Sequence, residues 1–177
     1  MWVPTLLALE PPGGVPTGCI FSAMMMAITI GGMAYPPIQN LFSKYFSYSQ
    51  RGPEACASFV YLLAAISMAV PSVSIVNASS EVALFVTLAS FLVFEGCVGL
   101  FMPVAGTLRS KYVPDSLQGA ILNIFRLPLN AVVVGGTYAT DVLDPAVVFK
   151  LVSLSFFFAA LLQGSLIIKT HKSTKTN

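Results

Sequence analysis

The chain has 177 residues, of which 56% are hydrophobic and only 9% are charged. Its mean hydropathy is +0.83. Soluble domains are roughly 45–50% apolar and about 25% charged, so this composition excludes a soluble protein and predicts an integral membrane protein. The net charge of +2 is too small to indicate binding to nucleic acid.

Signatures of enzymes and metal sites are missing from the sequence. There is no Gly-rich phosphate loop, and no Cys/His ligand set or Ser-His-Asp constellation can form, because the single histidine, His171, lies in a polar tail. We therefore expect neither catalysis nor a bound metal or cofactor. Cys19, Cys56 and Cys97 all lie inside apolar segments, and we interpret them as small packing residues.

Five apolar segments are long enough to cross a bilayer as helices, since about 20 residues span the roughly 30 Å hydrocarbon core. They cover about 17–41, 53–76, 81–108, 116–138 and 146–168. Residues 1–9 would rise only about 13 Å and are interpreted as the end of a truncated helix. Residues 169–177 form a basic tail. The whole chain is predicted to be one partial, all-α transmembrane domain.

Local signals refine the first two of these spans. Pro36 and Pro37 should kink the first span or end its regular part. Gly18 and Ser22 have a small-xxx-small spacing, which favours close approach of helices in lipid. Glu54 follows a proline at the start of the second span, where its charge suits the positive end of the helix dipole.

Basic residues are distributed unevenly between the two ends of these spans. The loops after the first and third spans and the tail collect seven of the nine Lys and Arg residues, namely Lys44, Arg51, Arg109, Lys111, Lys169, Lys172 and Lys175. The opposite side holds only Lys150, together with Glu10, Glu81, Asp141 and Asp144. By the positive-inside rule, the C-terminus is expected in the cytoplasm. A plasma-membrane location is the corresponding expectation.

Two charges lie inside apolar spans, Glu95 in the third and Arg126 in the fourth. A charge at the bilayer centre costs between about 2.5 and more than 10 kcal/mol, so such residues usually face a bundle interior and have a partner. Glu95 is roughly 20 Å from its cytoplasmic end and Arg126 roughly 14 Å from its own, a difference of about 6 Å. An arginine side chain can reach that far, so both a structural ion pair and a role in substrate or proton binding remain open.

Polar and glycine positions line one face of each of these two spans. Asn123, Arg126 and Asn130 share a face with Gly119, and Glu95 shares a face with Gly99, Met102 and Gly106. Such stripes are typical of a central cavity, although the asparagines could instead join helices by hydrogen bonds. Pro128 and Pro103 are expected to kink their helices, and Pro128 lies within one turn of Arg126.

The same region resembles a known family. The segments VFEGCVGLFMP, GTLRSKYVPD and ILNIFRLPLN, together with MWVPTL and GCIFSAMM near the start, are similar to the molybdate-anion transporter family of the major facilitator superfamily. The resemblance implies the C-terminal half of a major-facilitator-type bundle, with five complete transmembrane helices and the end of a sixth. It also implies an N-terminal half of the transporter as partner, which this sequence does not include, and a cytoplasmic C-terminus.

Three functions remain possible at this stage. The first is uptake of a small oxyanion, with molybdate implied by the resemblance and with Arg126, Asn123 and Asn130 binding the substrate. The second is transport of a neutral or organic solute, in which Glu95 carries a coupling proton and Arg126 only holds it. The third is a truncated membrane protein that does not transport.

The uneven charge distribution makes the orientation testable by labelling. Single cysteines introduced at Ser49, Ser110 and Ser173, in a background lacking the native cysteines, should react with a membrane-impermeant maleimide only after the cells are permeabilised, because all three positions are expected in the cytoplasm. A cysteine on the opposite side, at Asp144, serves as the control and should react in intact cells. Labelling of Ser49, Ser110 or Ser173 from outside would reverse the orientation.

Overall fold

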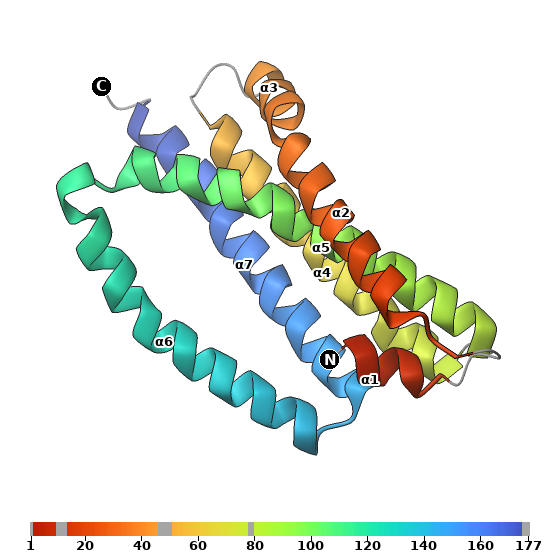
Figure 1. The fold of residues 1–177 in the computed structure, drawn as a ribbon. Coiled ribbons are helices and arrows are strands. Elements are labelled where there is room, and N and C mark those ends of the chain that lie inside the picture. Colours follow the sequence, from red (N-terminus) through yellow and green to blue (C-terminus); the bar gives the residue numbers. More distant parts are fainter. Residues whose placement is uncertain (1, 10–13, 46–50, 78–79, 175–177) are drawn as a thin grey trace.

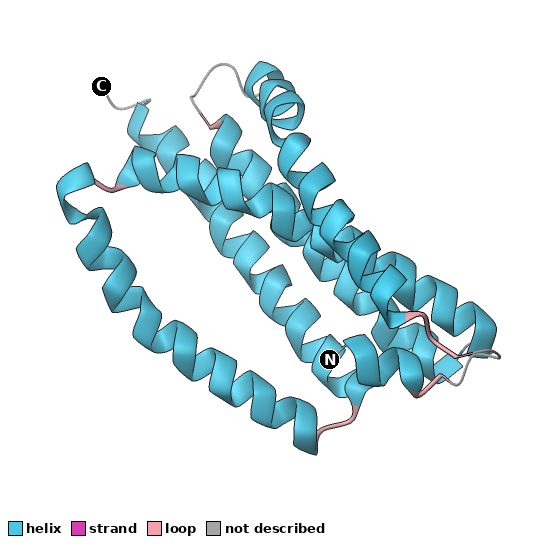
Figure 2. Ribbon diagram, in the orientation of Figure 1, coloured by secondary structure: helices cyan, strands magenta, loops and turns pink. Residues whose placement is uncertain are grey.

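The structure is a computed structural model that describes residues 2–9, 14–45, 51–77 and 80–174. Every regular element among these residues is a helix (Figure 2), as expected for residues that must satisfy their backbone hydrogen bonds within lipid. The helices are α1 (Trp2–Leu7), α2 (Thr17–Met33), α3 (Tyr35–Tyr45), α4 (Gly52–Asn77), α5 (Ser80–Tyr112), α6 (Asp115–Val142) and α7 (Pro145–Thr174). The prediction of an all-α membrane protein is confirmed.

Helices α4 and α5 form the centre of the bundle. The helix α2 packs against α5, α7 packs along α4, and the short α3 lies against α4 (Figure 1). An apolar cluster that includes Met24, Met68, Phe91 and Phe149 joins α2, α4, α5 and α7. The Phe91 and Phe149 rings lie 5.6 Å apart between centroids.

The helix α6 lies apart from this bundle. It is connected by short turns to α5 and α7, and its ribbon runs beside α7 at a distance (Figure 1). None of its residues is buried, and its contacts with α7 are few. The helix that carries Arg126 is therefore not part of the packed core.

The first predicted span, 17–41, is not one continuous helix. It breaks at Ala34 into α2 and α3, whose axes differ by 40°. The break lies just before Pro36 and Pro37, which lack backbone N–H groups and disfavour helical conformation in the preceding residue. Four helices are long and apolar enough to cross a membrane among the described residues, and five if the bent α2–α3 pair counts as one span.

Three helices continue beyond the predicted ends of their spans, and the span boundaries themselves stay predictions. The helix α5 continues past 108 to Tyr112, α6 past 138 to Val142, and α7 through the predicted tail to Thr174. No proline or glycine interrupts these extensions, so nothing in the local sequence ends the helices where hydropathy falls. Hydropathy marks where a helix leaves the apolar layer, which is a different position from its last hydrogen-bonded turn.

The backbones of α2 and α5 meet at glycines. A Cβ atom on Gly31 would overlap the carbonyl oxygen of Gly96, and one on Gly99 would overlap the carbonyl oxygen of Ile28. The predicted close approach at Gly18 is wrong, because Gly18 has open space around it and Ser22 donates its hydroxyl hydrogen bond to the Gly18 carbonyl, at 2.9 Å. The contact instead lies four turns of helix further along α2.

Replacing Gly99 by Ala should destabilise the bundle. The added methyl group would meet the α2 backbone, which cannot move aside as a side chain can, and overpacking of this kind costs about 1–3 kcal/mol. The matched control is Gly106→Ala on the same helix, where no atom lies within 4 Å and the higher helix propensity of Ala should be neutral or stabilising. Thermal melting of the purified chain in detergent, followed by circular dichroism, measures both. Equal melting temperatures for the two variants would contradict this contact.

Candidate functional site

The guanidinium of Arg126 lies on the exposed surface of α6. It is 11 residues after the first residue of that helix, or about 17 Å along it, close to the helix midpoint. Asn123 and Asn130 lie one turn to either side and are exposed as well. No hydrogen bond or ion pair joins Arg126 to any residue that the structure describes.

The carboxyl group of Glu95 is half-buried on α5. It is 17 residues from the end of that helix at Tyr112, or about 26 Å, which makes the depth difference from Arg126 about 9 Å rather than 6 Å. The helices α5 and α6 scarcely touch. Within the described ranges no ion pair connects Glu95 with Arg126, so the structure does not bring the two predicted charges together.

The predicted glycine stripe on α5 divides between two environments. Gly99 is buried in the crossing with α2, so the expectation that it lines a cavity is wrong. Met102 is exposed and Gly106 has open space beside it. Sequence spacing identified the shared face correctly, but that face meets a neighbouring helix at one end and is open at the other.

Both predicted kink positions lie inside unbroken helices. The helix α5 continues through Pro103, where the Thr107 hydroxyl donates a hydrogen bond to the Pro103 carbonyl at 3.0 Å. The helix α6 continues through Pro128 and curves gently over its length (Figure 1). A proline at this position still leaves the Ile124 carbonyl without its usual helical donor. Kinking at either proline stays a prediction.

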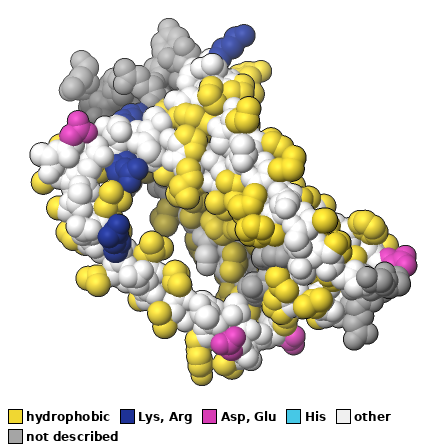
Figure 3. All heavy atoms as spheres, viewed as in Figure 1, with side chains coloured by type: hydrophobic (Ala, Val, Ile, Leu, Met, Phe, Trp, Pro, Cys, Tyr) yellow, Lys and Arg dark blue, Asp and Glu magenta, His cyan; other side chains and the backbone are white. Residues whose placement is uncertain are grey.

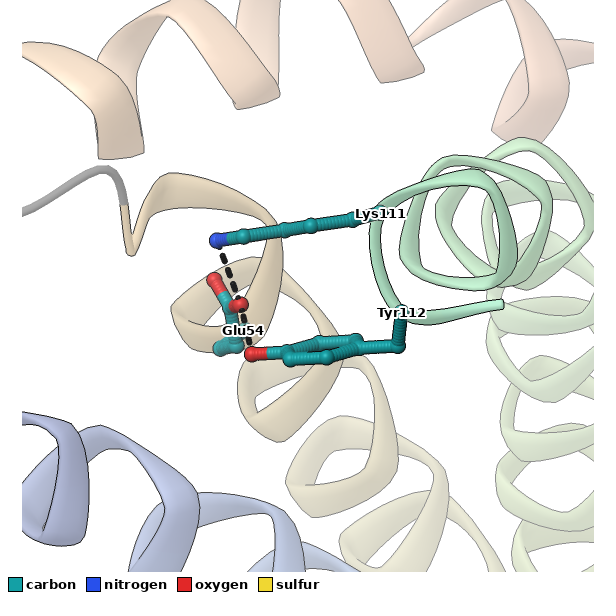
Figure 4. A network of polar contacts seen from close by, with 3 residues as sticks. All are labelled: Glu54, Lys111 and Tyr112. Atoms are coloured by element: carbon teal, nitrogen blue, oxygen red, sulfur yellow. Dashed lines mark hydrogen bonds and ion pairs between the residues drawn. The ribbon is translucent and has the colours of Figure 1, made fainter. Parts of the chain in front are cut away.

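A polar cluster that sequence reasoning did not identify ties the start of α4 to the end of α5. The Glu54 side chain, only 2% exposed, accepts a hydrogen bond from Lys111 Nζ at 2.6 Å and one from the Tyr112 hydroxyl at 2.5 Å, both on Oε1 (Figure 4). The other oxygen, Oε2, is buried without a partner among the described residues. The first turn of α4 adds its positive dipole end to this environment.

The sequence contained part of the information needed to predict this cluster. Glu54 and Lys111 were both expected at the cytoplasmic ends of adjacent antiparallel helices, and opposite charges at such ends often pair. The sequence placed Lys111 in a loop, however, whereas it lies in the last turn of α5 and points toward α4 (Figure 4). The pairing of Glu54 with Lys111 could therefore be predicted only with the true end of α5, at Tyr112.

Comparison with known proteins identifies relatives by sequence over part of the chain. Over 130 residues, or 73% of the chain, the sequence is 29% identical to a molybdate-anion transporter from Xenopus tropicalis and 30% identical to one from Danio rerio. These matches cover 26% and 24% of the two relatives, so the chain matches about a quarter of their length. No family model and no solved structure matches. The resemblance predicted from the motifs is confirmed.

Replacing Lys111 by Ala should destabilise the bundle, because it leaves the buried Glu54 carboxylate with one donor fewer. Loss of one partner of a buried hydrogen-bonded group costs about 1–3 kcal/mol, and the 32% exposure of Lys111 favours the lower part of that range. Glu54→Gln should be milder, since it removes the buried charge. Lys44→Ala, on an exposed side chain of α3, is the control. Chemical or thermal unfolding in detergent tests this, and identical stabilities for Lys111→Ala and Lys44→Ala would refute it.

Proposed function

Taking as premise that this chain is a relative of the molybdate-anion transporters, we propose that it forms part of a transporter for a small oxyanion, most simply molybdate. In this proposal it is not an enzyme. Arg126 binds the anion, and Asn123 and Asn130 donate further hydrogen bonds from the same face of α6. The rest of the transporter, corresponding to the N-terminal half of a major facilitator protein, covers the exposed side of α6.

The observation that carries the proposal is a guanidinium that lies halfway along an apolar helix of span length and has no ion-pair partner among the described residues. A cation at that depth is costly unless it faces water or a counter-charge. A tetrahedral oxyanion supplies the charge, and its oxygens match the planar fork of N–H donors on arginine. Arg126 has no ion-pair partner among the described residues, which leaves these donors available.

The lack of buried residues on α6 supports a site completed by another part of the transporter. The amides of Asn123 and Asn130 add donors without adding charge, which suits an anion that must be released again. Open space beside Gly119, on the same face, leaves room for a substrate. Binding sites of secondary transporters lie near the midplane between two structural repeats. Arg126 lies close to the midpoint of α6, which agrees with a position near the membrane midplane.

The orientation in this proposal has the C-terminus in the cytoplasm of a plasma-membrane protein. The distribution of charge on the folded chain supports it. Basic side chains gather toward one end of the bundle, whereas most acidic side chains visible in the same view lie toward the other end (Figure 3).

A second candidate, proton-coupled transport of a neutral or organic solute, rests on Glu95. Its carboxyl group is half-buried within an apolar helix and has no hydrogen-bond partner among the described residues. A carboxyl group in that environment can take up and release a proton. The two candidates predict different consequences for the loss of Arg126.

Uptake of molybdate by cells expressing a complete transporter that contains this segment is the decisive measurement. Arg126→Ala should abolish uptake, and Arg126→Lys should keep the charge but raise KM about 10- to 100-fold, because the bidentate fork is lost. Arg109→Lys, at the end of α5, is a matched control that should leave KM unchanged. All variants are compared at equal surface expression.

The double variant Glu95→Gln with Arg126→Gln separates anion binding from a purely structural pairing. If the two residues only neutralise each other in the complete protein, each single replacement leaves an unpaired buried charge and the double replacement relieves that penalty. Recovered uptake in the double variant would therefore eliminate Arg126 as the anion ligand. Recovered expression without uptake agrees with the proposal.

A further inference from the structure

A groove runs along the α4–α7 pair, on the side of α4 that faces away from α5. Its volume is about 360 Å³, and it is bounded by side chains of both helices. The opposite side of α4 packs Val60 and Ala64 against α5. On the groove side, Leu62 and Ile66 are 42% and 53% exposed. The groove thus opens on the outer surface of the bundle formed by the described helices.

Small residues and one hydrogen bond create this groove. The Ser153 hydroxyl of α7 donates to the Ala65 carbonyl of α4 at 2.7 Å, which holds the two helices close together. Ala65 and Ala69 leave the floor low, while the larger Ile66 and Phe157 side chains form its walls. The groove therefore lies beside a point of close packing between α4 and α7.

The length and depth of the groove match one leaflet of a bilayer. Ser72 lies five residues before the end of α4, and Lys150 lies five residues after the start of α7, so both are about 7.5 Å from the same end of the bundle. Leu62 and Phe157 lie about 18–22 Å from that end. The groove therefore runs from the level of the headgroups to the bilayer midplane, about half of the roughly 30 Å core.

Among the residues that the structure describes, Lys150 is the only charged one that lines the groove. Its side chain is exposed, and it forms no ion pair with the described acidic residues, including Asp144 at the adjoining turn. A lysine at this depth can extend its ammonium group to the headgroup region while its methylene chain stays in the apolar layer. The groove thus combines an apolar channel with a single cation at its mouth.

We propose that this groove binds an anionic glycerophospholipid. One acyl chain lies along the floor formed by Ala65 and Ala69, and the headgroup phosphate binds the Lys150 ammonium group. The chemistry requires both parts, since the channel selects an acyl chain and the single cation selects a lipid with net negative charge over a zwitterionic one. This site is separate from α6 and from Arg126, so it stands whether or not the proposed transport is correct. In the orientation proposed above, its mouth lies in the leaflet opposite the cytoplasm, because Lys150 is near the end of α7 that is far from the C-terminus.

Native mass spectrometry of the 177-residue chain, equilibrated with phosphatidylglycerol or phosphatidylcholine, tests the proposal. The unmodified chain should retain phosphatidylglycerol preferentially. Lys150→Met keeps the length of the apolar stem and should reduce that retention about fivefold, the effect of one cation near an anionic surface. Lys150→Arg should retain it. Ala69→Phe should also reduce it by filling the groove, without any change in charge, and Lys44→Ala on α3 should have no effect.

Three results would overturn the assignment. Equal retention by the unmodified chain and Lys150→Met would remove the role of the cation. Equal retention by Ala69→Phe would show that the lipid is bound only to the general surface of the bundle. Equal retention of phosphatidylcholine by the unmodified chain would remove the preference for an anionic headgroup. Circular dichroism confirms that each variant is folded, and the charge and groove variants test the site independently of one another.

Discussion

The contact between the backbones of α2 and α5 is the interaction on which the rest of the bundle depends. In lipid, helices gain little from burying leucine, because the surroundings are as apolar as the side chain, so close packing must hold them together. Gly31 and Gly99 allow that packing, because a side chain at either position would overlap the backbone of the other helix. Glu95 directly precedes Gly96, whose carbonyl group lies at this crossing.

The helical segments and the break near Pro36 could be predicted because hydropathy and proline act locally. The same information could not give the helix ends, since α5 has no breaking residue between Arg109 and Tyr112 and simply continues. Because the predicted span ended at residue 108, four residues before the end of α5, the Glu54 cluster was not predicted. The prediction placed Lys111 in a loop, whereas its side chain projects from the last turn of α5 toward α4.

The faces of the helices could be predicted, but their neighbours could not. Spacing showed that Gly99 shares a face with Glu95, yet only tertiary structure shows that α2 covers this glycine. The expected meeting of Glu95 and Arg126 failed for the same reason, because consecutive helices need not be adjacent and α6 lies apart from α5. The position of Arg126 near the middle of an apolar helix, in contrast, could be predicted from the sequence, and the structure agrees with it.

The Glu54 cluster also has a mechanical consequence for α6. By tying Tyr112 and Lys111 to α4, it fixes the end of α5, and only Val113 and Pro114 separate that end from α6. The other end of α6 is tethered to α7 through Leu143 and Asp144. The helix therefore runs about 42 Å between two short connections and makes few contacts with the bundle along the way. The position of the Arg126 guanidinium thus depends on how the two ends of α6 are held, and the Glu54 cluster holds one of them.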